Sequence, residues 1–263
     1  MKSHARITLA ALSAALLSSL GLNLLLLLLW RADDRRLQTL RLDPLGLSAF
    51  PSPTPPAQPP VIVFYGDSRA AAWEAPAIPG VTILNRGISG QTTAQILGRF
   101  EAHIAPLDPQ IIVIQAGIND LKNISLFPEQ EDAIIQSCKD NLQRIVQRSL
   151  DSGAHVILTT IFPLGELPLT RRLLWSTTVA TAITEVNVYL RTLAAPQVTI
   201  FESGDLLTDP QSGSVKSQYS LDSLHLNPAG YAELNQALSG MLDVALNSHN
   251  TTGEVHEFQP PAP

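Results

Sequence analysis

Five short apolar runs along residues 61–202 constrain the fold of this chain more than any other feature. They read VIVFY, VTILN, IIVIQ, HVILTT and VTIFE, at residues 61–65, 81–85, 111–115, 155–160 and 198–202. Their near-continuous hydrophobicity is typical of β-strands that are covered on both faces. Each run is therefore predicted to be a buried strand.

Helical patterns separate these runs, at residues 92–104, 131–151 and about 175–193. A last helix follows the fifth run, with Asn227 as a plausible N-cap and Pro228 at the first helical position. Strands and helices that alternate in this way predict an α/β domain over residues 61–248, with a parallel sheet between two helix layers.

Small and polar residues follow the strands, where active sites of such sheets gather. Ser68 follows the first run, and Asp222 and His225 stand just before the last helix. A serine nucleophile needs a base and a group that fixes the tautomer of that base. Ser68 is therefore the candidate nucleophile, His225 the candidate base and Asp222 the group that orients it.

Acyl transfer also needs donors for the oxyanion that forms on the attacked carbonyl. Gly87 follows the second run and Asn119 follows the third. The backbone N–H groups of Ser68 and Gly87 and the side-chain amide of Asn119 are the candidate donors.

Four segments resemble the conserved blocks of the SGNH, or GDSL-type, serine hydrolases. They are GDS at 66–68, the glycine of NRGISG at 87, GIND at 117–120 and DSLH at 222–225. Ser68, Gly87, Asn119 and His225 correspond to the four family letters. The resemblance covers nearly all of residues 61–248 and implies a flavodoxin-like α/β/α sandwich with a five-stranded parallel sheet. It also implies a serine esterase or lipase that uses no metal or organic cofactor.

The residues around these segments are assigned structural roles or contacts with the substrate. Asp67 and Asp120 are predicted to support loops, since an aspartate beside a strand end more often accepts backbone hydrogen bonds. Arg69, where the family signature has Leu, is either a solvated residue that opens a helix or a contact for an anionic or sugar substrate. Trp73 and Trp175 are candidate substrate contacts, although core packing explains a tryptophan about as well.

Other classes of function find little support in the sequence. The formal net charge is −6, and the predicted domain carries most of the acidic excess, which argues against a nucleic-acid partner. His, Cys and carboxylate residues lack the spacing of a metal site. Cys138 lies on the apolar stripe of a predicted helix and is expected to be a buried structural thiol.

Outside the predicted domain, residues 7–30 carry no charge and are long enough to cross a bilayer as a single-pass helix. The stretch ends in Leu-Leu-Trp-Arg without an Ala-x-Ala site, which favours an uncleaved signal anchor over a cleaved signal peptide. Residues 1–6 form a short polar N-terminus, residues 31–60 a charged and then proline-rich linker, and residues 249–263 a disordered tail. The positive-inside rule does not decide the orientation; the resemblance implies a catalytic domain on the periplasmic or extracellular side.

The leading hypothesis is a membrane-anchored esterase that cleaves a short-chain acyl or acetyl ester of a lipid or an envelope carbohydrate through an acyl-Ser68 intermediate. An O-acyltransferase that acts on envelope polysaccharide with the same three residues is one alternative. A catalytically silent carbohydrate-binding module is another. The sequence leaves the oligomeric state open.

Overall fold

The computed structural model describes residues 2–51, 60–167 and 177–254 and divides the chain into two units, Met1–Gly46 and Leu47–Pro263. The larger unit contains a five-stranded sheet in the order β2-β1-β3-β4-β5, with every pairing parallel. The strands are β1 (Val61–Gly66), β2 (Thr82–Gly87), β3 (Ile111–Gln115), β4 (His155–Thr159) and β5 (Val198–Phe201). The predicted parallel sheet is confirmed.

The edge strands depart from the prediction of full burial, β2 most of all; in β5, at the other edge, Thr199 and Ile200 are half-buried. All six residues of β2 are only half-buried, because β2 lies at the edge of the sheet and pairs with β1 alone. β1 and β3, which are central, are buried throughout. An apolar run therefore indicated a strand correctly, but it did not distinguish an edge strand from a central one.

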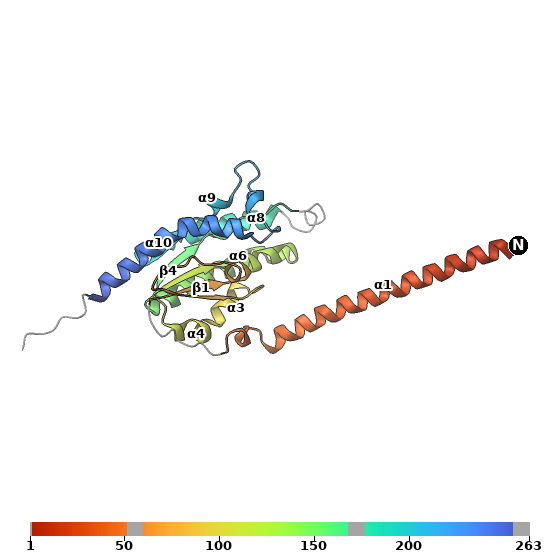
Figure 1. The fold of residues 1–263 in the computed structure, drawn as a ribbon, viewed down its shortest axis with the longest axis horizontal. Helices are drawn as coiled ribbons and strands as arrows, with labels where there is room; N and C mark the ends of the chain where they lie inside the picture. Colours follow the sequence, from red (N-terminus) through yellow and green to blue (C-terminus); the bar gives the residue numbers. More distant parts are fainter. Residues whose placement is uncertain (1, 52–59, 168–176, 255–263) are drawn as a thin grey trace, which may run out of the picture. The chain divides into compact units, whose positions relative to one another are not determined.

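The helices follow the strands in alternation (Figure 1). In the larger unit they are α2 (Ser68–Ala71), α3 (Thr93–Gly98), α4 (Phe100–His103), α5 (Ile118–Leu121), α6 (Glu131–Asp151), α8 (Thr177–Arg191), α9 (Ser203–Leu207) and α10 (Pro228–Glu254), with short 3-10 turns η1 (Leu47–Ala49), η2 (Ala105–Leu107), η3 (Lys122–Ser125), η4 (Pro128–Gln130) and η5 (Ser217–Tyr219). The helix predicted over 92–104 is instead split into α3 and α4. The break follows Gly98, and glycine is a poor helix former.

Two hydrophobic clusters lie on opposite faces of the sheet. Val63 and Tyr65 of β1 belong to the cluster that includes residues of α3, α6 and α8. Ile62 and Phe64, their neighbours along the strand, belong to the cluster that includes α10. Because side chains alternate between the faces of a strand, this division is that of an α/β/α sandwich. The predicted three-layer fold is confirmed, and Cys138 is fully buried in the first cluster.

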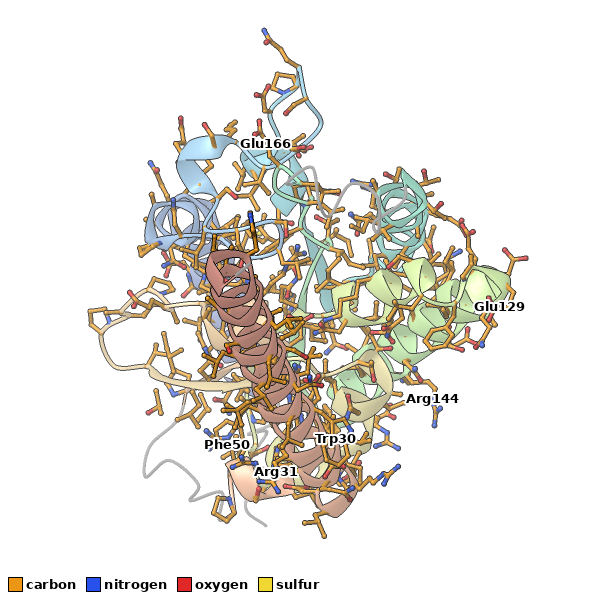
Figure 2. All side chains as sticks on the ribbon, turned by 90° about the vertical axis from the view of Figure 1, so that its right-hand side faces the viewer. Trp30, Arg31, Phe50, Glu129, Arg144 and Glu166 are labelled. Carbon is orange, nitrogen blue, oxygen red and sulfur yellow. The ribbon has the colours of Figure 1, made fainter. Side chains whose placement is uncertain are left out.

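The smaller unit contains α1 (Lys2–Leu42), within which Ala10–Leu42 is apolar enough to cross a membrane, as a signal sequence also would be. Trp30 and Arg31, labelled in Figure 2, mark the end of the charge-free run. The helix continues for eleven residues beyond Arg31, so the first part of the predicted linker is helical. Hydrogen bonds such as Gln38 Nε2 to Asp34 Oδ1, four residues apart, accompany this continuation.

The ends of the other predicted segments also shift. The proline-rich residues 52–59 lie outside the described residues. α10 continues to Glu254, so the tail predicted to be disordered from residue 249 begins with helix, and residues 255–263 again lie outside the description.

Candidate active site

Ser68 is placed by a tight turn between β1 and α2. Gly66 ends the strand beside β3, where an added Cβ would lie 1.8 Å from Gln115 O, so only glycine fits. Asp67 then caps α2 by accepting a hydrogen bond from Arg69 N at 2.8 Å. Ser68 is the first helical residue, and its backbone N–H donates to no acceptor within the described part of the chain.

The structure brings Ser68, His225 and Asp222 into one chain of hydrogen bonds. His225 Nε2 lies 3.0 Å from Ser68 Oγ, and His225 Nδ1 lies 2.9 Å from Asp222 Oδ2. An Nδ1–H that donates to Asp222 leaves Nε2 as the acceptor for the Ser68 hydroxyl. The arrangement has the geometry of a nucleophile, its base and the group that orients the base.

Asp222 is also held by its own loop. Its Oδ1 accepts hydrogen bonds from Leu224 N at 2.7 Å and from His225 N at 2.8 Å. Partial burial favours a higher pKa for Asp222, but the hydrogen bonds from the His225 side chain and from the two backbone N–H groups outweigh it and lower the pKa below its ordinary value. The carboxylate is therefore ionised at neutral pH and can stabilise a protonated imidazole.

Asn119 lies in α5, directly after β3, the strand that pairs with β1. Its side chain is almost fully buried, its Nδ2 donates to Gln91 O at 3.0 Å, and its Oδ1 accepts from Lys122 Nζ at 2.6 Å. An amide nitrogen carries two hydrogens, so one N–H of Asn119 remains available for an oxyanion.

Gly87 does not fit the donor role that the sequence suggested. Its N–H already donates to Asn85 Oδ1 at 2.8 Å. A Cβ at this position would lie 2.2 Å from Ala71 N, so the glycine lets the end of β2 pass close beside α2. The prediction that Gly87 supplies an oxyanion donor is therefore wrong for this structure, and the reason for a glycine here is steric.

Sequence reasoning missed Gly90, the second glycine of the same NRGISG segment. Gly90 has a φ of 80°, a left-handed conformation that favours glycine. It is exposed, and its N–H has no acceptor among the described residues. Gly90 also precedes Gln91, whose carbonyl holds the Asn119 amide. The signal was present in the spacing of the segment, but two glycines were available and the sequence alone did not separate them.

Arg69 is neither solvated nor exposed to a substrate, which corrects both predictions for it. Its side chain is 0% exposed. The guanidinium donates to three main-chain carbonyls: Nε to Leu224 O at 2.8 Å, Nη1 to Phe162 O at 2.9 Å and Nη2 to Pro163 O at 3.4 Å. Burial lowers the pKa of Arg69 to about 10, which still leaves it charged at neutral pH. Arg69 thus ties the helix of Ser68 to the residue before His225.

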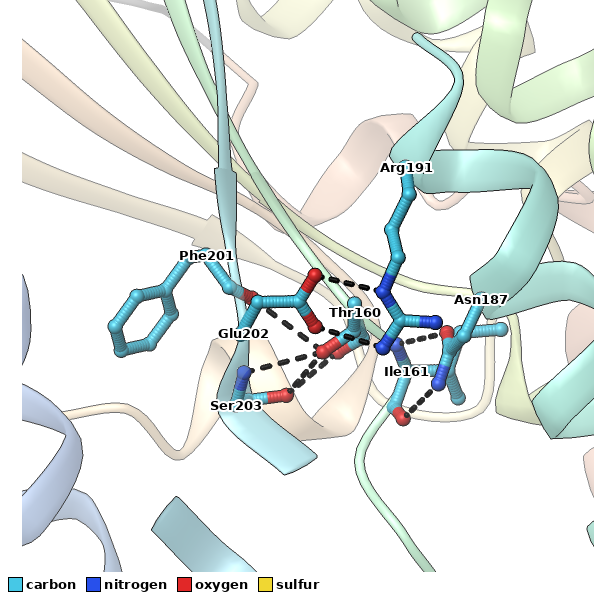
Figure 3. Close-up of polar contacts among 7 residues, drawn as sticks. All are labelled: Thr160, Ile161, Asn187, Arg191, Phe201, Glu202 and Ser203. Carbon is cyan, nitrogen blue, oxygen red and sulfur yellow. Dashed lines mark hydrogen bonds and ion pairs between the residues drawn. The ribbon is translucent and has the colours of Figure 1, made fainter. Parts of the chain in front are cut away.

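Two of the carbonyls that Arg69 holds, those of Phe162 and Pro163, belong to the loop after β4, and that loop is also fixed by α8 and α9. Asn187 of α8 accepts from Ile161 N at 2.7 Å and donates to Ile161 O at 3.0 Å (Figure 3). Ser203 Oγ donates to Thr160 O at 2.8 Å. The end of β4 is therefore held by α8 and α9 immediately before Phe162, so Arg69 connects the site to a rigid part of the sandwich.

The tryptophans give no support to a substrate contact. Trp73 is 2% exposed, packs edge-on against Phe64, and donates from Nε1 to Asn235 Oδ1 at 2.7 Å. It is a core residue, so its prediction as a substrate contact is wrong. Trp175 lies outside the described residues.

Asp67 is fully buried and Asp120 half-buried, and each lies beside the start of a helix. Asp120 accepts hydrogen bonds from Thr93 N at 2.9 Å and from Thr93 Oγ1 at 2.7 Å, at the first residue of α3. Burial raises the pKa of each carboxyl group to about 6. Within the described residues, neither carboxylate forms a hydrogen bond to His225 or Ser68, and no group of three or more His, Cys, Asp or Glu side chains could hold a metal ion.

Solved structures of other proteins share the fold of this chain. The chain resembles a GDSL-like lipase from Bacteroides thetaiotaomicron, with a TM-score of 0.62 and 20% identity over 76% of this chain and 98% of that one. It also resembles Axe2, an acetylxylan esterase from Geobacillus stearothermophilus, with a TM-score of 0.54 and 17% identity over 68% of this chain and 91% of that one. These identities are low enough that the structures support the fold alone.

No curated protein sequence matches the chain. A family model, however, matches residues 62–233, which include Ser68, Asn119, Asp222 and His225. That span is well over half of the chain. This protein therefore belongs to the GDSL-like lipase/acylhydrolase family, a family of carboxylic ester hydrolases.

Proposed function

We propose that this protein hydrolyses a carboxylic ester through an acyl intermediate on Ser68. The observation that carries the proposal is the chain of hydrogen bonds from Ser68 Oγ through His225 to Asp222, with lengths of 3.0 and 2.9 Å. It stands where β1 gives way to α2, at the carboxyl end of a central strand, which is where active sites of parallel sheets gather.

His225 acts first as a base and then as an acid. Its Nε2 takes the proton of the Ser68 hydroxyl as Oγ attacks the ester carbonyl carbon. The bond between that carbon and the alcohol oxygen then breaks, and Nε2 gives its proton to the departing alcohol. In the second half, His225 takes a proton from water, the resulting hydroxide attacks the acyl-Ser68 carbonyl, and the proton returns to Oγ as the acid leaves.

The oxyanion is stabilised by N–H groups that are free to donate. The Ser68 N–H and the second N–H of the Asn119 amide fill two of these roles. Gly90 N–H replaces Gly87 N–H as the third, because the N–H of Gly87 is already bonded within its own turn. Donors that are fixed before the reaction stabilise the transition state without reorganisation.

The proposed substrate is a short-chain acyl or acetyl ester of a lipid or an envelope carbohydrate. Two lines of support are the acetyl xylan esterases among the similar structures and the N-terminal helix that is apolar enough to cross a membrane. The helix favours a substrate fixed near a membrane, and the family resemblance favours a catalytic domain on the periplasmic or extracellular side.

An O-acyltransferase with the same three residues is the second candidate. The side chains of His225 and Asp222 are 32% and 49% exposed, so an alcohol acceptor as well as water can reach the acyl intermediate. The partition of the acyl group between water and an added sugar distinguishes the two: growth of an acylated sugar at the expense of free acid favours the transferase.

The test of the esterase proposal uses the full chain in detergent micelles with p-nitrophenyl acetate. Ser68→Ala should lower turnover at least about a thousandfold, since the nucleophile is removed. Ser239→Ala, which removes a hydroxyl bonded to Asn235 O in α10, is the matched control and should leave turnover unchanged. Equal turnover by Ser68→Ala and wild type contradicts the assignment.

A further inference from the structure

The segment between the apolar helix and the proline-rich stretch is packed on the hydrolase domain. Phe50, labelled in Figure 2, places its ring edge-on against the imidazole of His103, with centroids 5.3 Å apart. The guanidinium carbon of Arg86 lies 4.5 Å from the centre of the same ring. His103 Nε2 lies 3.3 Å from Leu47 O and donates to it. Both ends of Leu47–Phe50 therefore contact the domain.

These contacts lead to the oxyanion side of the site. With Nε2 of His103 protonated, its Nδ1 accepts from Arg99 Nη1 at 3.4 Å. Arg99 is fully buried; its Nε donates to Gln91 Oε1 at 2.6 Å and its Nη2 to Gly66 O at 3.0 Å. Gln91 O in turn accepts from the Asn119 amide. The loop that follows β2 is thus held by Arg99, which also contacts His103, the histidine that packs against Phe50.

The second contact of Phe50 reaches the same loop from the strand. Arg86 is the residue before Gly87 and is only half-buried at the edge of the sheet. The ring of Phe50 faces its guanidinium, an arrangement that attracts a cation to an aromatic face. The loop of residues 88–92 begins two residues after Arg86. Leu47–Phe50 is therefore linked to the start of this loop through Arg86, and to its interior through His103 and Arg99.

Resting on the function proposed above, we propose that Leu47–Phe50 is a positioning element of the active site, which holds the loop of residues 88–92 and the Asn119 amide in place for acyl transfer. The segment belongs to the same unit as the sheet. Along the chain, only residues 43–46 separate it from the end of α1. Phe50 and Val61, which lie on either side of the proline-rich residues in the sequence, both belong to this unit.

The experiment uses the full chain in detergent micelles and compares wild type with Phe50→Ala. Amide hydrogen exchange at residues 47–50 and 88–92 reads out docking and coupling without any turnover. We expect faster exchange in both segments of Phe50→Ala. We also expect kcat for p-nitrophenyl acetate to fall on the order of tenfold with KM unchanged, because a displaced donor weakens the transition state more than the bound ester. Phe50→Trp, which keeps an aromatic face, should restore both properties.

Phe127→Ala is the matched control, since Phe127 is an exposed phenylalanine outside the candidate site. It should change neither exchange nor kcat. Unchanged exchange at 47–50 in Phe50→Ala overturns the docking, and unchanged exchange at 88–92 overturns the coupling. Absence of esterase activity in wild type would contradict the proposed function, and the exchange data would still decide whether Leu47–Phe50 positions the loop of residues 88–92.

Discussion

Two fully buried arginines organise the two halves of the candidate site, and they differ in what they hold. Arg69 holds the base half, through the carbonyl of Leu224, the residue before His225. Arg99 holds the oxyanion half, through Gln91 Oε1 and Gly66 O. Among the described residues neither guanidinium has a carboxylate within ion-pair distance; both donate to neutral oxygens. Their role is therefore to fix backbone and loops.

The difference lies in where each half is anchored. The partners of Arg69 come from the loop after β4, which α8 and α9 fix, and from the segment before α10. The partners of Arg99 include His103, which contacts the segment next to α1. The base half thus depends on the sandwich itself, whereas the oxyanion half also depends on a segment outside it.

The largest expected effect is on the base half. Asp222→Asn replaces the carboxylate that accepts the Nδ1 proton with an amide that can donate, which favours the wrong tautomer of His225. We expect kcat to fall on the order of 10⁴-fold, as for the corresponding change in a serine protease triad. Steady-state kinetics on p-nitrophenyl acetate measure it, and a fall of less than tenfold would mean that Asp222 does not orient the base.

On the oxyanion half, Asn119→Ala should cost about a hundredfold in kcat, less than the change at Asp222, because the Ser68 and Gly90 N–H groups remain. KM should change little, since the donor acts mainly in the transition state. A variant whose KM rises while kcat is unchanged would instead indicate that Asn119 contacts the bound ester.

Arg69→Leu, which restores the residue of the family signature, should lower kcat on the order of tenfold. Leucine cannot replace the donors to three carbonyls, which should also cost about 3 kcal/mol in the free energy of unfolding. Arg69→Lys should recover part of both losses. The control is Arg148→Leu, which removes a hydrogen bond to Leu97 O on a helix distant in sequence from the site. Full activity of Arg69→Leu would contradict the role given to Arg69 in the base half, because the loop that carries His225 would then need no support from α2.

The last effect is on stability and its pH dependence, with no change expected in turnover. Burial raises the pKa of Asp120 to about 6, so its contribution to stability is fully present below the unfolded pKa near 3.8 and is lost as the pH rises through 6. Asp120→Asn removes this titration. The unfolding free energy of wild type relative to the variant should therefore fall by about 3 kcal/mol between pH 3.5 and 7. Denaturant unfolding at several pH values measures the difference, and a constant difference would contradict the raised pKa.

The sequence predicted the layers and the meeting of Ser68 with His225 because both follow from local patterns. Strand runs determine the sheet, and the ends of parallel strands lie at one edge of it. The role of Arg69 did not follow from such patterns, since two of its partners lie 93 and 155 residues away in sequence. A buried guanidinium among carbonyls is a tertiary arrangement that has no periodic signal.

The error at Gly87 has a different origin. Its N–H donates to the side chain of Asn85, two residues earlier, and that bond depends on how Asn85 is held by Ala70 O and Trp73 O.

Composition assigns the charged residues 31–42 to a linker, yet nothing in them prevents a helix from continuing. Composition separates polar from apolar segments, but it does not separate a polar helix from a polar linker.

The most direct test of the central claim is the site of reaction with a serine-directed fluorophosphonate, mapped by peptide mass spectrometry in wild type and in His225→Ala. If Ser68 is the nucleophile and His225 its base, the adduct forms on the peptide that contains Ser68, and its rate falls at least about a hundredfold in the variant. An adduct on another serine, or an equal rate in both proteins, would contradict the account.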